Sequence, residues 1–142
     1  MAILGVDQIA VAVESLDDAT RIYEKLLGIK AEHDETLLDQ GVKTRFFPVA
    51  GGPTTVEALE ALGPDTPVGK FLAKRGPGIH HIAFRVDDLK KELTRLKRLG
   101  IQLIDEEPRV GAEGKLIAFV HPKETGGVLI ELCQVPPRGR GA

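Results

Sequence analysis

The chain has 142 residues, of which 42% are hydrophobic and 28% are charged, and its formal net charge at pH 7 is −2. This length suits one compact domain or two small modules, and the charge argues against nucleic acid as a partner. No apolar run approaches the roughly 20 residues that a membrane span needs, and the N-terminus lacks a signal peptide's positive region. The single cysteine, Cys133, excludes an internal disulfide and suits a reducing cytoplasm. We therefore expect a cytoplasmic globular protein without a membrane partner.

The first half of the chain predicts a strand, a helix and then further strands. Apolar and polar residues alternate at first, Ser15 can cap the helix that follows, and Gly28 can end it. The expected strand, helix, short strand, polar loop and two hairpin-joined strands lie, in that order, at 5–13, 16–27, 29–33, 34–41, 42–49 and 54–59.

The second half of the chain repeats this order after a connector over residues 61–78. Within the connector, a short helix is expected over 67–75, because Pro67 suits the first turn of a helix. The strand, helix and three further strands that follow are expected at 79–86, 88–99, 101–105, 115–120 and 127–135. The last residues, 136–142, are rich in proline, glycine and arginine and are expected to form a flexible tail.

Two polar positions recur at a nearly constant spacing. Gln8 and the three residues after it match His81 and the three residues after it, 73 positions later. Glu57 and its neighbours match Glu131 and its neighbours, 74 positions later. Such self-similarity is the signature of an internal repeat.

The repeat predicts an α+β fold made of two tandem βαβββ modules. The first module would span residues 5–60 and the second residues 79–135, within a single domain over 1–142. Each half alone would bury a poor hydrophobic core, so the two sheets are expected to pair into a cup-shaped, barrel-like cavity. Inward residues of both modules would then line one cavity.

The four recurring polar residues lie in strands that are otherwise apolar, and they are Gln8, Glu57, His81 and Glu131. A buried carboxylate without a partner is costly, but two of them beside an imidazole and an amide suit a divalent cation. This donor set fits Mn²⁺, Co²⁺, Zn²⁺ or Fe²⁺ better than Cu⁺. The alternative is that Glu57 and Glu131 are solvated charges on outward faces.

Seven short segments carry a resemblance to a known family: PDTP (64–67), KFL (70–72), GIHHIAF (78–84), PRVG (108–111), GK (114–115), HPK (121–123) and GVLIEL (127–132). With the βαβββ repeat and its strand ligands, the chain resembles the vicinal-oxygen-chelate superfamily, which is glyoxalase-like. Within that superfamily it is similar to the methylmalonyl-CoA epimerase family. The resemblance covers nearly the whole chain and is densest over 64–133.

The resemblance implies an isomerase that interconverts (2R)- and (2S)-methylmalonyl-CoA with a divalent metal. The metal would be Co²⁺, with Mn²⁺, Zn²⁺ or Ni²⁺ as alternatives, and the protein would be a homodimer. The family's ligand positions fall on the four recurring residues, and Glu131 would also serve as a base. Removal of the α-proton makes an enolate that a bound cation stabilises as a Lewis acid.

Two positions depart from the family pattern. The family's first-strand ligand is usually histidine, and this chain has Gln8, whose amide oxygen is a weaker ligand. Some members have a glutamate, proposed as the second base, where this chain has Thr44. The acid opposite Glu131 therefore stays open.

Coenzyme A carries phosphates, and the nearest basic candidates in the matching segments are Arg109, Lys115 and Lys123. Each of these three basic residues can equally be an ordinary surface residue. His121 is a further candidate for substrate contact. We expect His80 to face away from His81 as a structural residue and His33 to be solvated. Cys133 is expected to line the cavity as a small hydrophobic residue.

Two other classes of function share this fold. Glyoxalase-like lyases and ring-cleaving dioxygenases are metal enzymes. Dioxygenases need two histidines and a carboxylate as ligands, and Gln8 in place of a histidine argues against a dioxygenase. A metal-free small-molecule binding protein is the other alternative, and it would not need polar residues at all four positions.

Overall fold

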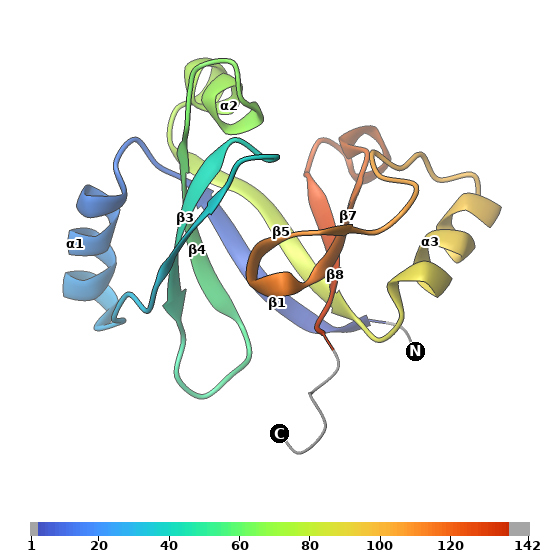
Figure 1. Ribbon diagram of the computed structural model, residues 1–142, viewed down its shortest axis with the longest axis horizontal. Coiled ribbons are helices and arrows are strands. Elements are labelled where there is room, and N and C mark those ends of the chain that lie inside the picture. Colours follow the sequence, from blue (N-terminus) through green and yellow to red (C-terminus); the bar gives the residue numbers. More distant parts are fainter. Residues whose placement is uncertain (1–2, 137–142) are drawn as a thin grey trace. The chain divides into compact units, whose positions relative to one another are not determined.

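The computed structural model describes residues 3–136 (Figure 1). The described chain divides into two compact units, Val6–Ile82 and a second made of residues 3–5 with 83–136, called here the N-terminal and C-terminal units. The element order repeats strand, helix and three strands, first as β1-α1-β2-β3-β4 and, after α2, as β5-α3-β6-β7-β8. The predicted βαβββ repeat is therefore confirmed. The boundaries predicted for the modules stay a proposal.

The N-terminal unit holds most of β1, two helices and a mixed set of strands. Its elements are β1 (Ile3–Ala12), α1 (Leu16–Leu27), β2 (Asp34–Leu37), β3 (Val42–Pro48), β4 (Thr55–Ala61), α2 (Pro67–Arg75) and the start of β5 (Gly78–Val86). The strand order is β2-β3-β4-β1-β5, with β2, β3 and β4 antiparallel and β1 parallel to β4. The expected hairpin between β3 and β4 is confirmed.

Hydrophobic clusters cover two faces of this sheet. On one face α1 packs on β3 and β4, with Leu16 and Ala19 against Phe47 and Ala58 (Figure 1). On the other face, α2 places Val68 in a cluster whose buried strand members are Ala10, Ala12, Val42 and Leu59. The alternation of side chains along β1 therefore separates a face covered by α1 from a face that carries Gln8 and α2.

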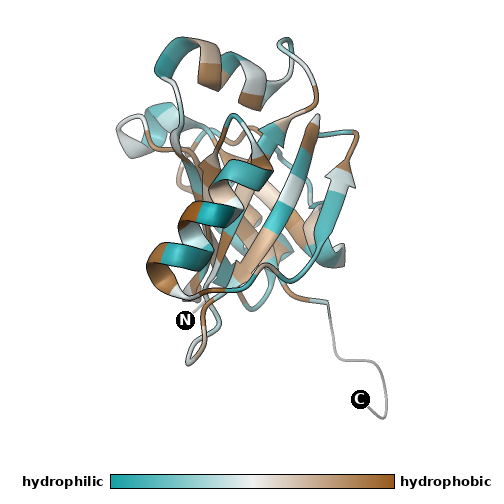
Figure 2. Ribbon diagram, turned by 90° about the vertical axis from the view of Figure 1, so that its left-hand side faces the viewer, coloured by the Kyte–Doolittle hydropathy of each residue, from teal (hydrophilic) through white to brown (hydrophobic). Residues whose placement is uncertain are grey.

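Local sequence signals set the ends of the helices. The Ser15 hydroxyl accepts a hydrogen bond from the Asp18 amide, 3.2 Å away, and Gly28 ends α1 in the left-handed conformation with φ 66°. Thr66 caps α2 through the Gly69 amide, with Pro67 in the first turn. The outward face of α1 mixes hydrophilic and hydrophobic positions (Figure 2), and its exposed apolar residues are Ile22, Leu26 and Leu27.

The C-terminal unit contains the rest of β5 and the second set of elements. These are α3 (Leu89–Arg98), β6 (Arg109–Val110), a 3₁₀ turn (Ala112–Gly114), β7 (Leu116–Val120), a second 3₁₀ turn (Pro122–Thr125) and β8 (Ile130–Gln134). The strand order is β5-β8-β7-β6. Leu89 and Leu93 of α3 pack on Val86, Ala118 and Leu132. Over residues 3–136, no helix is long and apolar enough to cross a membrane.

Two strand predictions are wrong. Residues 29–33 form no strand. The strand β2 lies instead in the segment expected to be a polar loop, because residues of that segment pair with β3 and Asp34 forms an ion pair with Arg45. Residues 101–105 form only an isolated bridge from Leu103 to Val120, and the third strand lies at β6. Of the tail predicted over 136–142, residues 137–142 lie outside the described part of the chain.

Candidate metal and acid–base site

A row of side chains crosses the face of the N-terminal sheet that carries Gln8. Glu57 on β4 stands opposite Phe46 on β3 and opposite Ala10 on β1. Residues that face each other across strands share a sheet face, so the carboxylate of Glu57 lies between a phenylalanine and an alanine. Gln8 lies on the same face, two residues before Ala10 on β1, because its register partner Thr55 precedes Glu57 by two residues.

The three candidate ligands in this unit are all buried. Gln8 is 5% exposed, Glu57 is 3% exposed and His81 is 4% exposed. They come from β1, β4 and β5, and β1 is the neighbour of both other strands in the sheet. A solvated position for Glu57 is therefore wrong, and its burial is the expected setting for a carboxylate that binds a cation.

His80 and His81 contact each other. Their Nδ1 atoms are 2.9 Å apart, although the predicted alternation of the strand had His80 facing away. That prediction is wrong because the His80 ring is held by Phe71 of α2, with ring centroids 5.0 Å apart. Burial, and to a lesser extent the charge of His81, lowers the pKa of His80 to about 4. His81 thus uses Nδ1 for a neutral neighbour and would present Nε2 to a metal.

The donor set fits a divalent metal. One imidazole nitrogen, one carboxylate and one amide oxygen are borderline to hard ligands, and they suit first-row divalent ions. Charge supports the same reading, because a cation would offset the buried carboxylate of Glu57.

In the C-terminal unit, Glu131 has a setting like that of Glu57. It is 4% exposed and faces Phe119 across β7 and β8. Cys133, two residues on, is fully buried and packs with Ala83 and Phe119, as its predicted role as a small hydrophobic residue requires. A solvated position for Glu131 is therefore also wrong.

The residues predicted to bind coenzyme A all lie in the C-terminal unit. Arg109 Nε is 3.3 Å from Asp105 Oδ1, and the guanidinium lies over the Phe119 ring at 5.7 Å from its centroid. Lys115 Nζ is 3.4 Å from Glu113 Oε1. The His121 side chain accepts a hydrogen bond from the Lys123 amide at 3.1 Å, which gives His121 a structural role at the second 3₁₀ turn.

Thr44, which stands where some family members have a glutamate, is fully buried on the face that carries Glu57. It faces Glu35 on β2, and its hydroxyl is 3.4 Å from the Glu35 carbonyl oxygen, to which it donates. A threonine bound in this way is not equipped to take a proton from a carbon acid.

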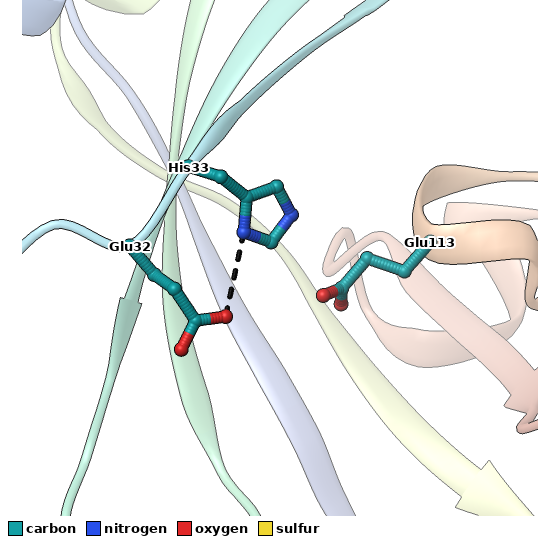
Figure 3. A group of neighbouring side chains, drawn as sticks. All are labelled: Glu32, His33 and Glu113. Atoms are coloured by element: carbon teal, nitrogen blue, oxygen red, sulfur yellow. Dashed lines mark ion pairs between the residues drawn. The ribbon is translucent and has the colours of Figure 1, made fainter.

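His33 is a residue whose setting sequence reasoning missed. It was expected to be solvated, but its ring stacks on Phe46, with centroids 4.6 Å apart and planes 24° apart. Its Nδ1 lies 3.4 Å from Glu32 Oε1 (Figure 3), and its Nε2 lies 3.9 Å from Glu35 Oε1. Figure 3 also draws Glu113, which belongs to the C-terminal unit. The signal in the sequence that could have indicated this setting was Phe46, an aromatic residue that faces Glu57 across the hairpin of β3 and β4.

Comparison with known proteins places this geometry in a family. A family model described as Glyoxalase/Bleomycin resistance protein/Dioxygenase superfamily matches residues 7–119. The uncharacterized protein YqjC of Bacillus subtilis is 47% identical over 133 residues, which cover 94% of this chain and 92% of that protein. The mitochondrial methylmalonyl-CoA epimerase of Homo sapiens is 38% identical over 129 residues, which cover 90% of this chain and 72% of the human protein.

Among solved structures, the methylmalonyl-CoA epimerase of Mycobacterium tuberculosis is similar to this chain with a TM-score of 0.93 and 38% sequence identity. The match covers 99% of this chain and 93% of that chain. The predicted glyoxalase-like α+β fold is confirmed. The chain therefore belongs to the glyoxalase/bleomycin resistance protein/dioxygenase superfamily and, within it, to the methylmalonyl-CoA epimerase family.

Proposed function

We propose that this protein is a methylmalonyl-CoA epimerase, an isomerase that interconverts the (2R) and (2S) forms of its substrate. The observation that carries the proposal is the buried set of one amide, one carboxylate and one imidazole on neighbouring strands, Gln8, Glu57 and His81, in a chain of this family. A metal-free binding protein would have no use for such a set, because burying these groups is costly.

The reaction needs a base, an acid and a means of stabilising negative charge. The α-proton lies between a thioester carbonyl and a carboxylate, and its removal leaves an enolate. We assign Glu131 as one base, since its carboxylate is buried on a strand, opposite Phe119, and a positioned carboxylate can take a proton from the substrate. A divalent cation, when bound, supplies Lewis-acid stabilisation of the enolate oxygens.

The metal ligands in this proposal are Gln8, Glu57, His81 and Glu131, and Co²⁺ is the proposed ion. Arg109, Lys115, Lys123 and His121 are proposed to contact the coenzyme A moiety, since cationic groups are suited to its phosphates. A homodimer in the cytoplasm is proposed as the working form of the protein.

The test combines elemental analysis of the purified protein with α-proton exchange of methylmalonyl-CoA in D₂O, with and without added Co²⁺. We expect about one metal ion per chain, as a single mononuclear site requires, and exchange that depends on the metal. Metal binding without exchange would point to a glyoxalase-like lyase of the same superfamily. Absence of both would contradict the proposal and favour a binding protein.

The role of Glu131 is tested in the same assay with Glu131→Gln. The amide keeps an oxygen that can bind the metal but cannot take a proton. Exchange should fall by at least about 100-fold, the usual contribution of a general base, with the metal retained. Undiminished exchange in this variant would remove Glu131 from the base role.

A further inference from the structure

The imidazole of His33 lies between two carboxylates on an aromatic surface. Glu32 is beside Nδ1 at 3.4 Å (Figure 3), and Glu35 is beside Nε2 at 3.9 Å. The Phe46 ring lies under the imidazole and is itself 1% exposed, so it fixes the plane in which the imidazole lies. A proton on His33 thus has an ion-pair partner on each side, while 38% of the side chain stays accessible.

The position of His33 relative to the metal ligands follows from the register of the strands. The carbonyl oxygen of His33 accepts a hydrogen bond from the Phe46 amide at 3.1 Å, and Phe46 faces Glu57. His33, Phe46 and Glu57 therefore form one row on one sheet face. Adjacent strands are about 4.8 Å apart, so the Cα atoms of His33 and Glu57 are separated by roughly 10 Å.

This spacing suits a small acyl group. The Phe46 ring is 1% exposed and covered by the imidazole of His33, so the groups of this row that can hold or move charge are the Glu57 carboxylate and the imidazole. A small acyl group bound along this row would have Glu57, a proposed metal ligand, at one end and the imidazole of His33 at the other.

The C-terminal unit has a similar row with a different group over its phenylalanine. There Phe119 faces Glu131, and the cation over the ring is Arg109, held by Asp105. A guanidinium stays protonated and cannot pass a proton on, whereas an imidazole can both give and take one. Of these two groups, His33 is the one whose chemistry suits proton transfer.

We propose that His33 is the second acid–base residue, the proton donor that the reaction requires besides Glu131; this inference rests on the proposed function. The base removes the α-proton, and the electron pair of the broken C–H bond enters the enolate. That pair then forms a new C–H bond with the proton from His33 Nε2, the N–H bond breaks, and a neutral imidazole remains. In the reverse direction the imidazole takes the proton. Glu32 is a positioning residue that holds Nδ1.

The test measures deuterium incorporation and inversion separately, starting from each epimer in D₂O with Co²⁺ present. Glutamine in His33→Gln keeps polar atoms at the site but cannot shuttle a proton. Inversion should fall by about 100-fold or more, the range for loss of a general acid. One epimer should still incorporate deuterium with retention of configuration, because the base that acts on it is intact.

A matched control is Lys30→Gln, an exposed cation three residues before His33. It should invert and exchange like the wild type. Inversion by His33→Gln within about twofold of this control, or equal loss of exchange from both epimers with metal and fold retained, would overturn the role of His33. A wild type that neither exchanges nor inverts the substrate would instead refute the proposed function, so the two failures are distinguishable.

Discussion

The ring nitrogens of His80 and His81 decide which atom of His81 can bind a metal. The contact between the two Nδ1 atoms, 2.9 Å long, orients the His81 ring, and Phe71 holds His80 in place from the other side. Partners of this kind beside a metal-binding histidine fix the tautomer and the direction of the ligand atom. His80 is thus a positioning residue within the proposed metal site.

Replacing His80 should therefore weaken metal binding without removing a ligand. In His80→Phe the ring contact with Phe71 can persist, but the bond to His81 Nδ1 is lost. Affinity for Co²⁺, measured by competition with a chelator, should fall by about 10- to 100-fold, as is usual when such a partner is lost. Ile79→Ala, a change at an exposed neighbour, serves as the control. Equal affinities would show that His80 does not orient the ligand.

His80 also makes stability depend on pH. Its pKa is lowered from 6.5 to about 4 in the folded protein, by burial first and by His81 second. Between these two values the unfolded chain binds a proton that the folded protein does not, so folding stability falls as pH falls through this window. Urea denaturation of metal-free protein at several pH values should show this loss. The slope should be shallower in His80→Phe, and an unchanged slope would assign the loss to other groups.

At the scale of elements, the sequence predicts helices better than the weakly apolar strands. Ser15, Gly28 and Pro67 are local signals, and the helix ends follow them. The strand β2 has no such signal, because its residues alternate little in hydrophobicity and their partners lie across a hairpin. Arg45 links β2 to β3 through Asp34, a contact that hydropathy cannot reveal. The position of His33 was missed for the same reason.

The docking of α2 depends on a close approach at Gly69. A Cβ at this position would lie 2.2 Å from the carbonyl oxygen of Gly63, which is backbone and cannot move aside alone. Gly69→Ala should therefore destabilise the protein by about 1–3 kcal/mol, in the range of overpacked sites. Lys74→Ala, at an exposed position of the same helix, should stay within about 0.5 kcal/mol. Equal unfolding midpoints in urea would contradict this account of α2.

For the whole molecule, the internal repeat was the most informative feature of the sequence. The 73- and 74-residue spacings identified four polar residues that are each 5% exposed or less, and burial of this kind follows from alternation within strands. The spacing could not reveal what overlies each phenylalanine, since His33 and Arg109 occupy unlike places in the sequence. Those contacts depend on the register between strands, which one sequence does not specify when residues are polar.

A bound metal should stabilise the folded protein, because the proposed ligands can bind it only when the strands that carry them are formed. Gln8, Glu57 and His81 belong to the N-terminal unit and Glu131 to the C-terminal unit. With Co²⁺ at about 100 times its dissociation constant, the gain is roughly 2.7 kcal/mol, which corresponds to a rise in Tm of about 5–10 °C. Calorimetry with and without Co²⁺ measures this rise.

Variants then show whether Glu131 is a ligand as well as a base. Glu131→Ala removes the carboxylate and should lose most of the metal-dependent rise in Tm, because a site with three protein ligands binds the ion more weakly. Glu106→Ala, an exposed glutamate of the same unit, should keep the full rise. A full metal-dependent rise in Tm in Glu131→Ala would show that the N-terminal unit binds the metal without Glu131. Glu131 would then act on the substrate only as a base, and the ligand set would need a water in its place.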